Sequence, residues 1–251
     1  MHRSTRPIPT TSQLIQDLAT QLSALNTLQL SPESLEAVRV IQLERLARRI
    51  ETVIPGHFGH GERTAHYALL LADRLGLTKN QRLDLRYAAL LHDVGLLMMP
   101  GHLLGAPAPH TLNDYALIQS HPREGAALLT SYTFLQVAAR LIAHHHERWD
   151  GAGYPYGLRG EYIPASARIL AIADVFDSIT SRTNSWDSAL RTLHASAGSQ
   201  FDPAFCVTFI ELLRNHDHYR AYQSSDLSSD AMHSQSSPEH VPEAYMTGSG
   251  I

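Results

Sequence analysis

The sequence predicts an all-α fold with a sizeable core. Apolar residues recur at intervals of three and four along most of the chain, and no run alternates between apolar and polar residues as a strand would. Hydrophobic residues make up 43% of the 251 residues, which is enough to build a buried core. The helical spacing and the missing alternation together predict helices packed on helices.

The first two expected helices lie before residue 54. Between Thr11 and Leu30, leucines spaced four and three apart predict a short amphipathic helix, whose apolar stripe is a candidate homodimer contact. In "SPES", Ser31 is a suitable N-cap and Pro32 suits the first helical position, so a second helix begins there and runs to about Val53. The turn-forming string "PGHFGHG" at 55–61 ends it.

The remaining helices follow from the same signals. A third is expected from about His60 to Gly76, and a fourth from its Thr78 cap to Gly95. After a loop rich in Pro and Gly at 100–110, helices are expected at about 111–120, 122–131, 134–147, 164–181, 186–196 and 202–214. We therefore divide the chain into a flexible N-terminus with an amphipathic helix (1–32), a helical domain (33–220) and a disordered tail rich in Ser, His and Pro (221–251).

Charge and composition exclude several classes of protein. The formal net charge of -4 leaves no basic stripe to neutralise phosphates, which argues against a DNA- or RNA-binding protein. No apolar run approaches the roughly 20 residues that span a bilayer, and the start "MHRSTRPIPTT" lacks the apolar stretch of a secretion signal. The single cysteine, Cys206, excludes an internal disulfide and a multi-thiolate metal site. We expect a cytoplasmic protein without membrane contacts.

Two aspartates stand in apolar surroundings that call for a cation. Asp93 follows His92 after the apolar string "AALL", near the end of the fourth expected helix. Asp174 lies inside the apolar run "RILAIADVFDSI", where a salt bridge to Arg168 is the alternative to a metal. Burying an ionised carboxylate without a partner costs several kcal/mol, so a positive group is expected beside each acid.

Histidines at other helix ends could complete a metal centre. His60 and His121 stand at expected helix starts, and His145 and His146 end a third helix. With His92, they give five histidines and two aspartates, enough for two divalent ions if one aspartate bridges. Imidazole and carboxylate without thiolate suit iron, manganese, nickel or zinc better than calcium or magnesium, without choosing among the first four. We expect iron or manganese first, with zinc or nickel as alternatives. Two such ions would polarise a bridging water for attack at phosphorus.

Five strings resemble the HD-GYP branch of the HD-domain metal phosphohydrolases. In order, they are "HDVG" (92–95), "SHPREGAALL" (120–129), "HHERWDGAGYPYGLRGEYIP" (145–164), "RILAIADVFDSITS" (168–181) and "AGSQFDP" (197–203). The resemblance covers about residues 57–210 and implies an HD-domain helical bundle with an HD-GYP extension within 33–220, preceded by short N-terminal helices. It also implies a metal centre that hydrolyses cyclic di-GMP.

The resemblance assigns roles to individual residues. It implies a first ion held by His60, His92, Asp93 and Asp174, and a second held by Asp93 as the bridge with His121, His145 and His146. Among these, His92 and Asp93 carry the catalytic role. Tyr154 would face the substrate, where its ring can stack on guanine, and Arg182 would contact the dinucleotide phosphates.

The sequence departs from the family pattern at four places, and most of the changes remove a charge. They are Gly56 where three-metal members have Glu, Leu96 where most members have Lys, Gly101 and Ala106 where an acid and a lysine are usual, and a shortened segment after Ser181. Gly56 implies a two-metal site, unless His57 substitutes for the missing Glu. The metal ligands are thus all present, while the groups that would bind phosphate are fewer.

These observations support one main hypothesis and two alternatives. The first is a metal-dependent phosphodiesterase that hydrolyses cyclic di-GMP through a metal-activated hydroxide. The second, motivated by Leu96 and the missing basic segment, is a catalytically weakened module that binds cyclic di-GMP or a signalling protein partner. The third keeps the metals but takes another phosphoester, such as a related cyclic dinucleotide.

Overall fold

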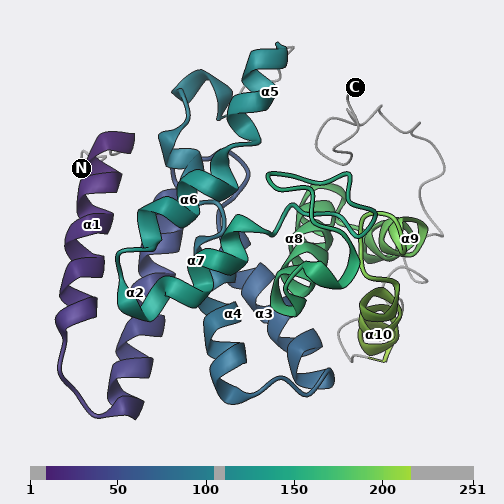
Figure 1. Cartoon of the computed structure of the whole chain (residues 1–251), viewed down its shortest axis with the longest axis horizontal. Coiled ribbons are helices and arrows are strands. Elements are labelled where there is room, and N and C mark those ends of the chain that lie inside the picture. Colours follow the sequence, from purple (N-terminus) through teal and green to yellow (C-terminus); the bar gives the residue numbers. More distant parts are fainter. Residues whose placement is uncertain (1–9, 105–110, 216–251) are drawn as a thin grey trace, which may run out of the picture.

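A computed structural model describes residues 10–104 and 111–215, and its regular elements in these ranges are helices (Figure 1). The α-helices are α1 (Thr11–Thr27), α2 (Pro32–Glu51), α3 (His60–Arg74), α4 (Lys79–Leu91), α5 (Leu112–Ile118), α6 (His121–Leu129), α7 (Gln136–Ala143), α8 (Ala165–Thr183), α9 (Trp186–Ser196) and α10 (Pro203–Arg214). Short 3-10 helices are η1 (Val94–Met98), η2 (Gly101–Leu103), η3 (Thr133–Leu135) and η4 (Gly160–Tyr162). The predicted all-α class is confirmed.

Three predictions concern residues that the structure does not describe. The flexible start at 1–9, Ala106 and the disordered tail at 221–251 all lie outside the described ranges. Within 10–104 and 111–215, no helix combines the length and the apolar character that crossing a bilayer requires.

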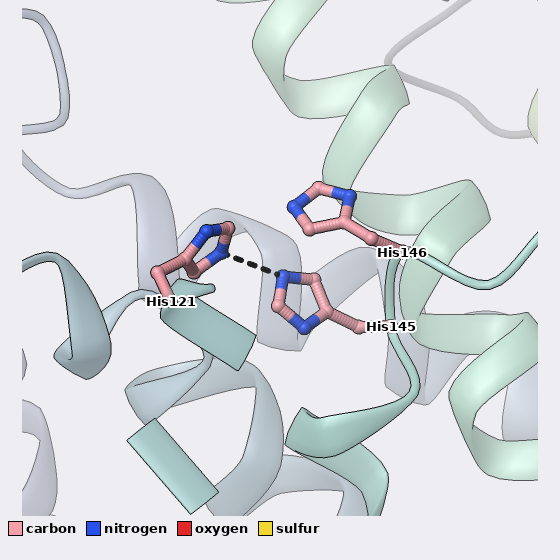
Figure 2. Close-up of side chains that lie close together, drawn as sticks. All are labelled: His121, His145 and His146. Carbon is pink, nitrogen blue, oxygen red and sulfur yellow. Dashed lines mark hydrogen bonds between the residues drawn. The ribbon is translucent and has the colours of Figure 1, made fainter. Parts of the chain in front are cut away.

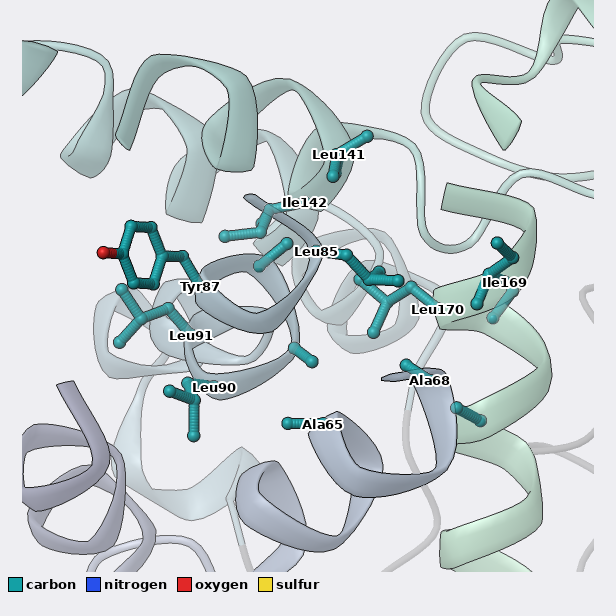
Figure 3. Close-up of a cluster of buried hydrophobic side chains, with 14 of the residues drawn as sticks. Ala65, Ala68, Leu85, Tyr87, Leu90, Leu91, Leu141, Ile142, Ile169 and Leu170 are labelled. Atoms are coloured by element: carbon teal, nitrogen blue, oxygen red, sulfur yellow. The ribbon is translucent and has the colours of Figure 1, made fainter. Parts of the chain in front are cut away.

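The core lies where α3, α4, α7 and α8 meet (Figure 3). α3 packs against both α4 and α8, and α4 packs against α7. Ala68 on α3 and Ala88 on α4 are fully buried, and such small side chains let helix backbones approach closely. Leu85 and Ile142 fill the space on the α7 side. These helices hold the ends from which the predicted ligands project.

α1 is part of the same core. Its leucine stripe, Leu14, Leu18, Leu22 and Leu25, is buried and belongs to the cluster that includes α3 and α4. α1 lies beside α2 and also contacts η1 (Figure 1). The stripe that the sequence singled out as a candidate dimer contact is therefore covered within the chain. A homodimer through the N-terminal helices stays a prediction, and it would have to use surfaces other than this stripe.

Two helices end earlier than the sequence predicts. The helix expected to reach Gly95 ends as α4 at Leu91, and the chain continues from Asp93 into η1. The helix expected over 134–147 ends as α7 at Ala143, so that His145 and His146 follow it rather than close it. In both cases a histidine ring binds a carbonyl oxygen of the last turn, and such contacts are typical of helix ends.

Candidate metal centre

The seven predicted ligands come from five helices and meet at one place. His60 is the first residue of α3 and His121 the first of α6, His92 caps α4, and His145 and His146 follow α7. Asp93 stands between α4 and η1, and Asp174 lies within α8. Segments as distant in sequence as α3 and α8 thus contribute to a single group of side chains.

His60, His92, Asp93 and Asp174 form the first half of the centre. The Nε2 atoms of His60 and His92 are 3.2 Å apart, and they lie 3.1 Å and 3.7 Å from the same Oδ1 of Asp174. Asp93 adds its Oδ2, 3.3 Å from Nε2 of His92 and 4.0 Å from Nε2 of His60. One atom each of His60, His92 and Asp93 lies within 4.8 Å of the others, close enough to share an ion.

His121, His145 and His146 form the second half (Figure 2). Nε2 of His121 is 3.3 Å from Nε2 of His145, and one ring nitrogen of each of the three lies within 4.8 Å of the others. Asp93 joins the halves, because its Oδ1 is 3.5 Å from Nε2 of His121 while its Oδ2 faces His92. One carboxylate therefore faces both groups, as a bridging ligand would.

Backbone carbonyls fix the orientation of three of the histidine rings, each through its own hydrogen bond. In each, Nδ1 lies within hydrogen-bond distance of the carbonyl three residues earlier, and that carbonyl belongs to the last turn of a helix. The pairs are His92 with Ala89 in α4 (2.9 Å), His121 with Ile118 in α5 (2.7 Å) and His145 with Ile142 in α7 (2.7 Å). A ring that donates from Nδ1 leaves the Nε2 lone pair free for a metal.

The three histidines of the second half are uncharged. Burial lowers the pKa of His145 and His146 well below the ordinary value of 6.5, and neighbouring imidazoles lower it further. Burial also lowers the pKa of His121, against the opposing effect of Asp93. These rings are therefore unprotonated near neutral pH, which is the form that binds a metal.

The first half contains both positively charged histidines and negatively charged aspartates. At His60, burial lowers the pKa, but hydrogen bonds to Asp174 and Asp177 outweigh it and raise the pKa to about 10. The charge of Asp93 likewise raises the pKa of His92 against burial. Burial raises the pKa of each aspartate, but the neighbouring histidines lower it by more. The net pKa lies well below the usual value for Asp93 and at about 2 for Asp174. Without a cation, protons on the histidines balance the carboxylates.

The chemistry of the donors fits a pair of divalent cations. His121 and His145 direct Nε2 atoms at each other across 3.3 Å while both Nδ1 atoms face carbonyls. A proton between the Nε2 atoms would make one ring a cation, which the lowered pKa values of these rings oppose. Two buried lone pairs are therefore left facing each other. A cation between them would satisfy both.

Two acidic residues beside the centre, Asp177 and Glu51, were not predicted from the sequence. Asp177 is buried, lies 2.7 Å from Nδ1 of His60 and accepts two hydrogen bonds from Arg63. It stands three residues after Asp174 in α8, a helical spacing that could have indicated a shared face. Glu51 at the end of α2 accepts from the backbone N–H groups of Gly59 and Gly61 at the start of α3. No local sequence pattern indicates a contact of this kind.

The loop after His146 is organised by Glu147. Its carboxylate accepts hydrogen bonds from the backbone N–H of Tyr156 (2.7 Å) and Leu158 (2.9 Å). A Cβ on Gly153 would lie 2.3 Å from the backbone nitrogen of Arg148, so only glycine fits there. Glu147 and Gly153 thus give the loop the shape that brings Tyr154 beside the centre.

The two predicted substrate-binding residues lie in different settings. The ring of Tyr154 stacks on that of His146, with centroids 5.0 Å apart, and burial raises the pKa of its hydroxyl above the usual range. Arg182 is exposed in the last turn of α8, where its Nε donates to the carbonyl of Ser178. It lies two turns beyond Asp174, about 12 Å along the helix axis. Tyr154 therefore contacts one of the predicted metal ligands.

A family model and curated relatives match this chain. The model described as HD domain matches residues 44–205. The cyclic di-GMP phosphodiesterase response regulator RpfG of Xanthomonas campestris is 43% identical over 172 residues, covering 66% of this chain and 45% of that protein. The 3'3'-cGAMP-specific phosphodiesterase 2 of Vibrio cholerae is 36% identical over 188 residues, covering 72% and 35%. A cyclic di-GMP phosphodiesterase of Thermotoga maritima is 32% identical, covering 71% and 51%. The chain spans about half or less of these relatives' length.

Two solved structures share the fold. One is a cyclic GMP-AMP specific phosphodiesterase of V. cholerae (V-cGAP3), with a TM-score of 0.58, 24% identity, and coverage of 76% of this chain and 53% of the other. The other is Bd1817, an HDG"Y"P protein of Bdellovibrio bacteriovorus, with a TM-score of 0.58, 20% identity, and coverage of 82% and 69%. At these identities the likeness concerns the arrangement of helices alone.

Proposed function

Because the chain belongs to the HD-domain family, we propose that it is a metal-dependent phosphodiesterase that hydrolyses cyclic di-GMP. The observation that carries this proposal is the geometry of Asp93, whose two oxygens face two separate groups of buried histidines. Relatives named as cyclic di-GMP phosphodiesterases, at 43% and 32% identity, support the substrate class.

The proposed ligand set is the one inferred from the sequence. His60, His92 and Asp174 would hold one ion with Asp93, and the three histidines of the second half would hold the other with the same Asp93. Divalent ions bound there would supply an acidified water and neutralise charge on the phosphate, which is the chemistry that phosphodiester hydrolysis requires. The mixed imidazole and carboxylate donors favour iron or manganese, with zinc or nickel as alternatives.

The chain's own residues would bind and orient the substrate. The ring of Tyr154 stands against His146, so a guanine stacked on its other side would lie next to the metal ligands. A base stacked on an aromatic ring contributes about 1–3 kcal/mol. Arg182 would attract phosphate from the end of α8. With Leu96 in place of a cation, fewer side chains would bind phosphate, so the ligands of the centre would carry more of that role.

Two further functions have an observation in their favour. The relative named as a 3'3'-cGAMP-specific phosphodiesterase is 36% identical, so the mixed dinucleotide is an alternative substrate. Leu96, which packs against the core instead of presenting a charge, favours a weakened module that binds cyclic di-GMP, or a signalling protein partner, without turnover. We rank hydrolysis of cyclic di-GMP first, because all seven side chains that would hold the metals are gathered at one place.

A turnover assay with a matched pair of variants tests the proposal. The purified chain is stripped of metal, reloaded with Mn²⁺ or Fe²⁺, and incubated with cyclic di-GMP or 3'3'-cGAMP while products are separated by chromatography. Asp93→Ala should lower turnover by more than about 100-fold, because even an outer partner of a metal ligand is worth about 10–100-fold. The control is Asp73→Ala, an exposed carboxylate paired with Arg82 on the surface, which should keep full activity.

The outcomes separate the candidate functions. Metal-dependent turnover of cyclic di-GMP, lost in Asp93→Ala and kept in Asp73→Ala, supports the proposal. Preference for the mixed dinucleotide favours the second substrate. Binding of cyclic di-GMP in a calorimeter without any product from metal-loaded protein favours the weakened module and rejects the enzyme.

A further inference from the structure

His57 stands at the edge of the centre, outside the seven residues that the sequence predicts as ligands. It belongs to the turn between α2 and α3, three residues before His60. We propose that His57 is an eighth metal-binding side chain, which binds through Nε2 the ion on the side of His60 and His92. The inference rests on the proposed function, because it requires that these two histidines hold a metal.

The contact with Asp93 gives His57 the spacing of a ligand. Its Nε2 lies 3.5 Å from Oδ2 of Asp93, the oxygen that also faces His92 at 3.3 Å and His60 at 4.0 Å. Donor atoms that each bind one ion at about 2.0–2.2 Å lie roughly 3–4 Å from one another. The His57 contact falls in the same range as those of the two buried histidines, and its ring meets that of His60 edge-on at 5.3 Å.

The ring of His57 is oriented in the same way as those of the predicted ligands. Its Nδ1 lies 3.1 Å from the carbonyl of Pro55, a distance at which it donates a hydrogen bond. His92 shows the corresponding contact with Ala89 at 2.9 Å. In both residues a backbone carbonyl takes the Nδ1 proton, so the Nε2 lone pair is free and faces Asp93.

The turn that carries His57 is firmly held. Gly56 and Gly59 adopt φ values of 79° and 74°, which favour glycine, and they allow the chain to reverse on either side of His57. The backbone N–H of His57 donates to Ile54 and its carbonyl accepts from His60. The buried carboxylate of Glu51 accepts from the N–H groups of Gly59 and Gly61, 2.6 Å and 2.8 Å away. The position of His57 is thus determined by the backbone.

His57 differs from the buried histidines in its access to solvent. Its side chain is 35% exposed, against 7% for His60 and 2% for His92. A pocket in the surface is lined by His57, His60, His92 and Asp93 together with Glu51, so His57 stands where the centre opens. A ligand at this point would close the open side of the first half and slow the loss of its ion.

A metal titration with four variants tests the inference. The full chain is stripped of metal and titrated with Mn²⁺ by calorimetry, and bound metal is counted by elemental analysis after gel filtration. His57→Ala should weaken the binding of one ion about tenfold or more and leave the other within about twofold, by analogy with the loss of a group that supports a metal ligand. His57→Glu, which restores a donor, should recover most of the affinity. His92→Ala should weaken binding on the same side at least as much.

The control is His102→Ala. His102 also faces a carboxylate, that of Asp114 at 4.0 Å, but its side chain is 71% exposed and it lies apart from both histidine groups. It should bind Mn²⁺ as the wild type does. Equal melting temperatures of metal-free wild type and His57→Ala would show that the loss of affinity does not come from unfolding.

The titration results either support or overturn the assignment of His57 as a metal ligand. Two ions bound by wild type, with unchanged affinities in His57→Ala, would overturn this inference and leave the proposed function intact. Equal weakening in His57→Ala and His57→Glu would also overturn it, because a donor at this position would then have no effect. If wild type binds none of Mn²⁺, Fe²⁺, Zn²⁺ and Ni²⁺ in the same titration, both the proposed function and this inference fail.

Discussion

The centre contains histidines that carry an extra proton near neutral pH and histidines that do not. Hydrogen bonds to two aspartates raise the pKa of His60 to about 10 against the effect of burial, while burial holds the pKa of His145 and His146 well below 6.5. A metal that binds His60 must displace its proton, whereas the second half is ready to bind. The difference arises from Asp174 and Asp177, whose carboxylate oxygens lie 3.1 Å and 2.7 Å from the ring nitrogens of His60.

The first prediction is that the metal-free chain is most stable near pH 6.5. An unfolded histidine titrates at about 6.5. Below that pH, His121, His145 and His146 take up protons only when the chain unfolds, so the free energy of unfolding falls as the pH drops. Between pH 6.5 and about 10, His60 keeps its proton only in the folded chain, so the free energy of unfolding falls as the pH rises.

Thermal unfolding in the presence of a chelator, measured from pH 5 to 9, checks this prediction. From pH 6.5 to 9 His60 by itself should account for a loss of about 3 kcal/mol, because each pKa unit corresponds to about 1.4 kcal/mol, and the raised pKa of His92 adds to this loss. Saturating Mn²⁺ should remove the alkaline loss, since the proton on His60 is then displaced. A stability that rises steadily up to pH 9 without metal would contradict it.

At the scale of residues, the sequence could name the side chains that gather at the centre, but not the residues that support them. Their role as metal ligands stays a prediction. The apolar surroundings of Asp174 and the His92–Asp93 pair indicated a buried cation from local sequence alone. The contact of His60 with Asp177 joins residues 117 positions apart, so no local pattern reveals it. The same holds for Glu51, whose partners lie across a turn in the next helix.

At the scale of elements, helix C-termini orient three of the candidate ligands. The last carbonyls of a helix have no partner within it. In this chain the ends of α4, α5 and α7 each offer such a carbonyl to a histidine of the centre. The sequence predicted these helices but extended two of them through their histidines, because helix propensity does not register a side chain that binds the last turn. The early ends of α4 and α7 therefore belong to the construction of the site.

The second prediction concerns the contact between η1 and α6. A Cβ on Gly95 would lie 2.0 Å from the carbonyl oxygen of His121 and 2.7 Å from the backbone nitrogen of Gly125. Gly95→Ala must therefore push α6 away, and with it His121. Overpacking of this kind costs about 1–3 kcal/mol, and we expect weaker binding of the second metal as well.

The matched control is Gly101→Ala, since a Cβ at Gly101 meets nothing within 4 Å. Its free energy of unfolding should stay within about 0.5 kcal/mol of the wild type, as for most surface substitutions. Denaturant unfolding and Mn²⁺ titration of both variants measure the two effects. A Gly95→Ala chain with wild-type stability and affinity would show that the two backbones can separate without moving the ligand.

At the scale of the whole molecule, α1 connects the first residues of the described chain to the centre. Its leucines belong to the same buried cluster as α3 and α4, and it packs against η1, which begins directly after Asp93. Polar contacts reinforce the arrangement, because Asn26 accepts from the N–H of Thr133, and Asp17 pairs with Arg49 of α2. The sequence separated residues 1–32 from the domain that begins at 33. That boundary stays a prediction.

The last prediction is that α1 unfolds together with the rest of the chain. Leu22 is fully buried, so Leu22→Ala should lower the free energy of unfolding by about 2–5 kcal/mol. For a chain of this size that loss corresponds to a fall in melting temperature on the order of 10 °C. Leu28→Ala is the control, because this leucine just after α1 is 37% exposed and its loss should change stability by less than about 0.5 kcal/mol. Calorimetry should show one transition for each protein, shifted only in Leu22→Ala. If α1 were an independent attachment, the main transition of Leu22→Ala would stay where it is in wild type, because the core over α3, α4, α7 and α8 would not depend on it.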